Sequence, residues 1–210
     1  MLQRVLFGIT ALLGSLPAVG QGSDTAFNSS CVRTPNYSYS ISVPSLEKVD
    51  FKNFRVFYQP GDSSDRGVVL RDGKYSKRDQ GGYEEVILEY VEVFKPSTEA
   101  EQHALISLHW TDCGGSCTTL GRIQVFTLRD SHPTIVQQIE YDRHAEGTGA
   151  TFNSMTGHLD VVARADDHSP NCCPMHLDIM RFDWNGKRFV PKASKTVTSI
   201  ESETESIDPH

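Results

Sequence analysis

The apolar residues of this chain gather in short segments that are rich in β-branched and aromatic residues and are interrupted by polar ones. Side chains alternate between the two faces of an extended strand, so segments of this length and composition are typical of β-strands. They span residues 86–94, 104–110, 121–128, 134–141, 158–164 and 176–184. Their regular spacing predicts a mainly β fold, an antiparallel meander that forms a sandwich or an irregular barrel, with at most one or two short helices.

Turn-forming dipeptides separate several of these segments. Asp72-Gly73 and Thr156-Gly157 each predict a hairpin turn, because glycine tolerates the positive φ that tight turns require. Asn185-Gly186 predicts a type I′ turn between the last two strands. We expect one short helix near residues 97–104, where Ser97 can cap the N-terminus and the following Glu, Ala and Gln residues favour helix.

The first 20 residues have the composition of a secretory signal. A single positive charge, Arg4, precedes an apolar run, Val5–Leu16, that is too short to span a bilayer. Ala18 and Gly20 then provide the small residues of a cleavage site. We therefore expect residues 1–20 to be removed and the protein to be secreted or periplasmic, with no membrane span after cleavage. The alternative is an uncleaved anchor.

The rest of the chain divides into three parts by composition. Residues 21–45 are rich in Ser, Asn and Pro and predict an irregular segment, and residues 46–191 predict a single β-rich domain. Residues 192–210 are polar and predict a disordered tail. Asn28 and Asn36 begin Asn-x-Ser sequons, which matter only in a host that glycosylates secreted proteins.

Acidic residues outnumber basic ones, 27 Asp and Glu against 20 Lys and Arg, and removal of Arg4 with the signal leaves a formal charge of −8. Such a surface repels phosphate groups, and no cluster of Lys and Arg is interleaved with aromatic residues. We therefore expect no nucleic-acid partner and no electrostatic adhesion to anionic lipid. The candidate partners are a small ligand or another protein of the cell envelope.

The five cysteines lie outside the signal segment, in a compartment where disulfide bonds persist. Cys113 and Cys117 enclose two glycines, which let the chain fold back tightly and predict a disulfide between the two. The alternative is a metal site of thiolate, imidazole and thioether ligands, which together suit Cu(I). Its candidate ligands are Cys113, Cys117, His109, Met175 and His176.

Cys172 and Cys173 are adjacent, and neighbouring Cα atoms are about 3.8 Å apart across a trans peptide, too close for an unstrained disulfide. We therefore expect Cys31 to pair with Cys172 or Cys173, which would hold the N-terminal segment against the domain. Closing this long loop would stabilise the fold by about 5 kcal/mol in the chain-entropy model. The odd number of cysteines leaves at least one thiol free, blocked or paired with another chain.

Asp166, Asp167 and His168 offer ligands for Ca²⁺ or an acidic hydrolase site. The same stretch contains Ser, Pro and Asn, so a solvated turn is the preferred interpretation. The chain contains no nucleophile elbow, no zinc-protease motif and no phosphate-cradling glycine loop. The sequence therefore assigns no catalytic residue, no metal and no cofactor.

The segment "PNCCPMHLDIMRFDWNGKRFV" resembles a pattern of bacterial secreted proteins and lipoproteins of the LppP/LprE type: a Cys-Cys-Pro, a strand and an aromatic-x-Gly hairpin. The resemblance covers residues 104–191 and is carried by Cys172, Cys173, Pro174, Trp184, Gly186 and Phe189. It implies a bacterial envelope protein and assigns no chemistry. The chain departs from the pattern in two ways, because no Asp- and Gly-rich turn precedes residue 104 and Cys31 lies too far beyond the apolar run for a lipid anchor.

Together these features predict an exported, disulfide-stabilised, non-catalytic β domain that binds or scaffolds a partner. The alternative is a periplasmic protein that handles copper or thiols through Cys113, Cys117, Cys172 and Cys173. The two hypotheses differ in the state of the sulfur atoms, which are joined to each other in the first and available for chemistry in the second.

Overall fold

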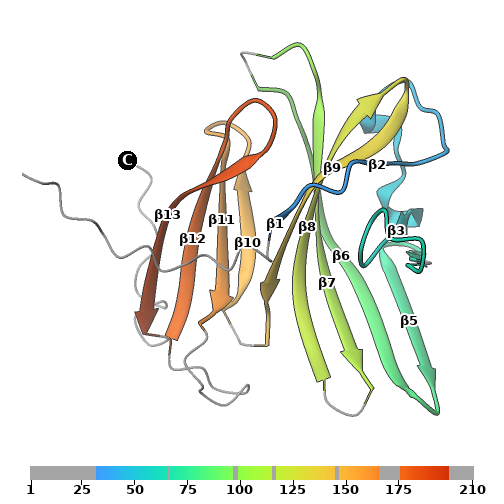
Figure 1. Cartoon of the computed structure of the whole chain (residues 1–210), viewed down its shortest axis with the longest axis vertical. Coiled ribbons are helices and arrows are strands. Elements are labelled where there is room, and N and C mark those ends of the chain that lie inside the picture. The colour runs from blue at the N-terminus through green and yellow to red at the C-terminus, as the bar shows by residue number, and fades with distance from the viewer. Residues whose placement is uncertain are drawn as a thin grey trace, which may run out of the picture.

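The computed structural model describes residues 32–65, 67–96, 99–114, 117–144, 147–165 and 176–198. Antiparallel strands make up most of this part of the chain, and it contains no α-helix. Two sheets face each other in a sandwich-like arrangement that does not close into a barrel (Figure 1). The mainly β, antiparallel prediction is confirmed.

The smaller sheet, and strands β5 to β9 of the larger one, are meanders in which strands that follow one another in sequence are neighbours. The larger sheet contains β5 (Lys74–Asp79), β6 (Gly82–Phe94), β7 (His103–Cys113), β8 (Cys117–Arg129) and β9 (His132–Asp142), with β1 (Val32–Arg33) and β2 (Tyr37–Ser38) paired to the outer edge of β9. The smaller sheet contains β10 (Gly149–Asn153), β11 (His158–Arg164), β12 (His176–Trp184) and β13 (Phe189–Thr198). All six predicted segments lie within these strands.

Strands β7, β8 and β9 of the larger sheet are buried on both faces, so their alternating side chains enter two different cores, whereas β5 is mostly exposed. One face packs against the smaller sheet through Leu105, Ile123, Val125 and Ile139. The other face packs against residues 39–57 through Ala104, Ile106, Leu108, Trp110 and Phe126. Residues 39–57 include two 3-10 turns, η2 (Leu46–Lys48) and η3 (Phe51–Asn53), and lead into the hairpin of β3 (Arg55–Val56) and β4 (Val68–Val69). The three layers lie side by side in Figure 1.

Three buried glutamines of the larger sheet bind the backbone of the layers that cover it. Gln124 and Gln138 donate from Nε2 to the carbonyl groups of residues 57 and 58, each at 3.1 Å, and Gln124 also donates to Gln138 at 2.8 Å. On the opposite face, Gln137 donates to the carbonyl of Phe189 at 2.7 Å and accepts from its N–H at 2.8 Å. These amides therefore hold both outer layers on the central sheet.

The predicted hairpin turns differ in outcome. Asp72-Gly73 forms a tight turn in which both residues have positive φ, and Gly157, at +72°, ends the turn between β10 and β11. The prediction of a two-residue turn at Asn185-Gly186 is wrong, because Trp184 pairs with Phe189 and four residues separate the strands. The Asn185 side chain accepts hydrogen bonds from the N–H groups of residues 187 and 188, which stabilises this longer loop.

The helix predicted over residues 97–104 is wrong. Ser97 lies outside the described residues, but residues 99–102 are not helical and β7 begins at His103. The side chains of Glu99 and His103 contact Trp184 in the other sheet, and these contacts outweigh the helical preference of the segment. At the other end of the domain, β13 continues to Thr198, past the boundary at residue 191, as an exposed edge strand on which polar side chains face solvent.

Gly121 in β8 offers a test of this packing. A β-carbon at this position would lie 2.0 Å from Cζ of Tyr141, so Gly121→Ala must displace a buried ring. We expect the free energy of unfolding in urea to fall by about 1–3 kcal/mol. Gly149→Ala is the matched control, because no atom lies within 4 Å of its β-carbon position. Equal stability of the two variants would contradict the packing described here.

Candidate functional site

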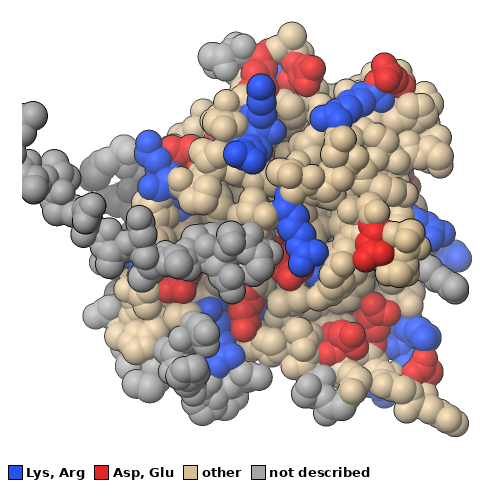
Figure 2. All heavy atoms as spheres, viewed as in Figure 1, with Lys and Arg blue, Asp and Glu red and all other residues tan. Residues whose placement is uncertain are grey.

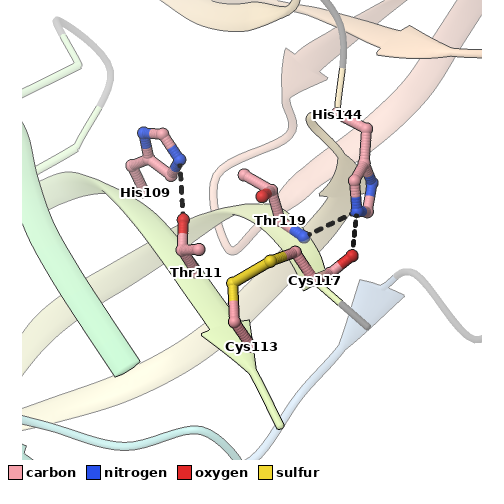
Figure 3. The surroundings of a disulfide bond; sticks show 6 residues. All are labelled: His109, Thr111, Cys113, Cys117, Thr119 and His144. Carbon is pink, nitrogen blue, oxygen red and sulfur yellow. Dashed lines mark hydrogen bonds between the residues drawn. A yellow bond between two sulfur atoms is a disulfide. The ribbon is translucent and has the colours of Figure 1, made fainter. Parts of the chain in front are cut away.

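The predicted disulfide between Cys113 and Cys117 is present at the tip of the β7–β8 hairpin (Figure 3). The two cysteines are the last directly opposed pair of the β7–β8 ladder. The bond therefore closes the hairpin tip and does not join separate layers of the fold.

His144, which follows β9, lies beside the disulfide and contacts the start of β8 (Figure 3). Its Nε2 accepts a hydrogen bond from the N–H of Thr119 at 2.9 Å and lies 3.0 Å from the carbonyl oxygen of Cys117. Its Nδ1 lies 2.7 Å from Oδ1 of Asp142, and Arg164 at the end of β11 lies 3.8 Å from the other oxygen. These contacts connect the hairpin tip to the ends of both sheets.

The candidate metal ligands do not converge in the described part of the chain. The sulfur atoms of Cys113 and Cys117 are bonded to each other. His109 lies four residues before Cys113 on β7, which is about 13 Å along a strand. His176 begins β12 in the other sheet, and Met175 lies outside the described residues. The geometry therefore favours a structural disulfide over a metal site at this pair.

Several predicted residues fall outside the described part of the chain, and the hypotheses based on them stay predictions. They are Cys31, Cys172, Cys173, Asp166, Asp167, His168, Asn28 and the signal segment. Asn36 is described, and its side-chain oxygen accepts a hydrogen bond from Arg129. Among the described residues, no helix is long and apolar enough to cross a membrane.

A polar network lies on the face of β6 and β7 that carries the disulfide. Glu89 occupies a β-bulge in β6, which redirects its side chain toward Ser107 and Arg143. Ser107 donates to Glu89 at 3.0 Å, and burial raises the pKa of the adjacent Tyr141 to about 12. Ser107 is fully buried, so the network stabilises the sheet and does not present a nucleophile to a substrate.

A cleft opens at the opposite end of the sandwich, where loops from both sheets meet. Its volume is about 710 Å³, within the roughly 300–1,000 Å³ of small-molecule sites. The β6–β7 connection, the β10–β11 turn and the β12–β13 loop form its walls. Its lining includes Lys95, Pro96, Glu99, Met155, Thr156 and Trp184.

Glu99 and Trp184 form a fixed pair in this cleft. Trp184 donates from Nε1 to one oxygen of Glu99 at 2.6 Å, and the other oxygen lies 2.9 Å from Nε2 of the buried His103. The indole ring also packs edge-on against Phe94 and Phe189, with centroid distances of 5.4 and 5.1 Å. Because Trp184 belongs to the smaller sheet and Glu99 precedes β7, this contact joins the two sheets at the cleft.

The loops leave this carboxylate only partly accessible, because 16% of the Glu99 side chain is exposed and each of its oxygens already has a partner. Gly186 has φ of +93°, and a β-carbon there would lie 3.5 Å from the Glu99 oxygen that accepts from Trp184. Met155, at the tip of the β10–β11 turn, is 93% exposed. Lys95, which lies four residues before Glu99 in the sequence, is also exposed. The cleft therefore presents an ammonium group and apolar surface to solvent, with the Glu99 carboxylate held in its wall.

Comparison of the chain with protein-family models, with curated proteins and with solved structures finds no match. The cleft is therefore identified from its geometry alone. Sequence reasoning placed Glu99 in a helix and Trp184 in a strand and connected neither with a site. The only signal in the sequence was the aromatic residue before Asn185-Gly186, which marks a loop at a strand end.

Loss of the Cys113–Cys117 bond is expected to have a modest effect on stability. The loop it closes is so short that the chain-entropy model assigns it about 2 kcal/mol. The measurement is urea unfolding of the wild type and of the Cys113→Ser/Cys117→Ser variant, with non-reducing peptide mapping to verify the bond. Global unfolding of the variant, or two free thiols at these positions in the purified protein, would contradict the prediction.

The lowered pKa of His109 predicts that the stability of the protein depends on pH. Burial, followed by the charge of Arg143, lowers the pKa of His109, while Glu89 and Glu85 act in the opposite direction. The unfolded chain therefore binds this proton first, and stability falls as the pH drops below the ordinary histidine value of about 6.5. We expect the loss in free energy of unfolding between pH 7.5 and 5.5 to be smaller in His109→Gln. An equal loss in both proteins would exclude His109 as its source.

Proposed function

We propose that this chain is an exported, disulfide-stabilised, non-catalytic β domain that binds a small ligand in the cleft formed by its loops. The observation that carries the proposal is the Glu99–Trp184 pair, which is held rigid between the two sheets at the wall of a cleft of about 710 Å³. Binding groups that are fixed before the ligand arrives lose little conformational entropy on binding.

The lining indicates the chemistry of the ligand. The indole, the thioether of Met155 and the ring of Pro96 offer apolar contact, and Thr156, Glu99 and Lys95 offer hydrogen-bonding and charged groups. This mixture suits a compact molecule with one apolar face and several polar substituents. Among the described residues of the lining, none pairs a nucleophile with a histidine base, which supports binding over catalysis.

Two features, the N-terminal segment and the disulfide bond, support export. The apolar run after Arg4 has the length and flanks of a secretory signal. The Cys113–Cys117 bond belongs to a class of cross-link that persists in oxidising compartments.

A ligand-detected NMR screen of monosaccharides, amino acids and nucleosides tests the binding role. Ser154 is exposed in the β10–β11 turn and lines the cleft, so Ser154→Trp fills the cleft without disturbing the core. We expect any compound that binds the wild type to lose at least about tenfold in affinity, or 1.4 kcal/mol, in this variant.

Lys187→Trp is the matched control, because Lys187 is exposed in the β12–β13 loop and does not line the cleft. It should bind as the wild type does. Retention of binding by Ser154→Trp, or an equal loss in both variants, would show that the ligand site lies elsewhere.

A further inference from the structure

A second concave surface, the β4–β5 groove, lies on the layer opposite the smaller sheet. Its volume is about 650 Å³, and it runs between the β3–β4 hairpin and the start of β5. It is lined by Arg55, Gly67, Val68, Val69, Arg71, Lys74, Tyr75 and Ser76. Three of these residues are basic and none is acidic, although the chain as a whole carries a net charge of −7.

The turn at Asp72-Gly73 creates this groove. Arg71 and Lys74 exchange two backbone hydrogen bonds across the turn, at 2.8 and 3.1 Å. Beyond this pair the two strands diverge, because β4 pairs with β3 and β5 pairs with β6. A groove therefore remains between them, with basic side chains from β3, from the turn and from β5 along its walls.

The three cations of the β4–β5 groove differ in whether their charge is already paired, and Arg55 and Lys74 both have interaction partners. Lys74 forms an ion pair with Glu85 on β6 at 2.6 Å. The exposed side chain of Arg71 has no carboxylate partner among the described residues. Figure 2 shows Lys and Arg side chains, interspersed with Asp and Glu side chains, at the edge of the molecule where Figure 1 places β3 and β5.

We propose that the β4–β5 groove binds a ligand through its oxyanion groups, of the carboxylate, sulfate or phosphate type. The planar guanidinium of arginine matches two oxygens of such a group, and Arg55 and Arg71 line the same groove. Tyr75 and Ser76 of β5 complete the lining. The net negative charge of the protein opposes the approach of an anion at long range, so binding depends on the local cations of the groove. Added salt screens their attraction for the anion and is expected to weaken binding.

Two probes distinguish the two kinds of ligand that carry oxyanion groups. Tripolyphosphate represents a small free anion, and a heparin hexasaccharide represents a chain of sulfated sugars. Binding of each to the full chain is measured by calorimetry at about 20 mM and about 150 mM salt, where the screening length falls from roughly 20 Å to 8 Å. Binding of either probe to the wild type identifies the source, and binding of neither at the lower salt overturns the proposal.

Arg71→Glu tests whether the groove is the site. We expect about tenfold weaker binding, because a guanidinium that contacts the oxyanion is replaced by a like charge. Arg188→Glu is the matched control: it makes the same change in net charge at an exposed position of the β12–β13 loop. Its effect should be below about twofold. Equal losses in the two variants would show that net charge alone governs binding and would overturn the proposal.

Two further variants keep the outcome unambiguous. Arg71→Gln removes the charge without reversing it, and far-UV circular dichroism of both Arg71 variants verifies that the sheet is intact. Ser154→Trp, which fills the loop cleft at the other end of the molecule, should bind the anion as the wild type does. The failure of the cleft proposal and the failure of this one are therefore distinguishable.

Discussion

The burial of the central strands of the larger sheet, β7 to β9, on both faces is the constraint on which the rest of the structure depends. A strand covered on two sides has no solvent-facing positions, so each polar side chain on it needs a partner inside the protein. Gln137 and Gln138 are adjacent in β9 and point to opposite faces, where one binds the backbone of Phe189 and the other the backbone of residue 58. Because an unpaired buried amide is costly, each layer can dock in only one position along the sheet.

The loop cleft follows from this docking. Phe189, which Gln137 binds through both its N–H and its carbonyl, is the register partner of Trp184 at the end of β12. The same interaction that seats the smaller sheet therefore brings the indole ring within reach of Glu99. The Glu99–Trp184 hydrogen bond then holds the β6–β7 connection against the β12–β13 loop. The packing of the two sheets therefore determines the position of the cleft, in addition to the loops that line it.

The opposite layer is held by charge as well as by amides. The guanidinium of Arg122 is fully buried, forms an ion pair with Glu140 at 2.7 Å, and lies over the rings of Tyr58 and Trp110 at 4.1 and 4.9 Å. Removing one partner of such a pair leaves a buried charge and is strongly destabilising. This cluster and Gln124 together hold residues 57 and 58, from which the hairpin that borders the β4–β5 groove continues.

What could be predicted from the sequence was local, and what could not be predicted depended on distant partners. The strands, the turn at Asp72-Gly73 and the Cys113–Cys117 bond follow from residues close together in the chain. The segment beginning at Glu99 has the composition of a helix, but its structure is decided by Trp184, 85 residues away. Likewise, Gln137 looks like an ordinary surface residue of a strand until Phe189, 52 residues later, is placed beside it. A polar residue becomes structurally decisive through its partner, and a pattern of apolar and polar positions contains no information about that partner.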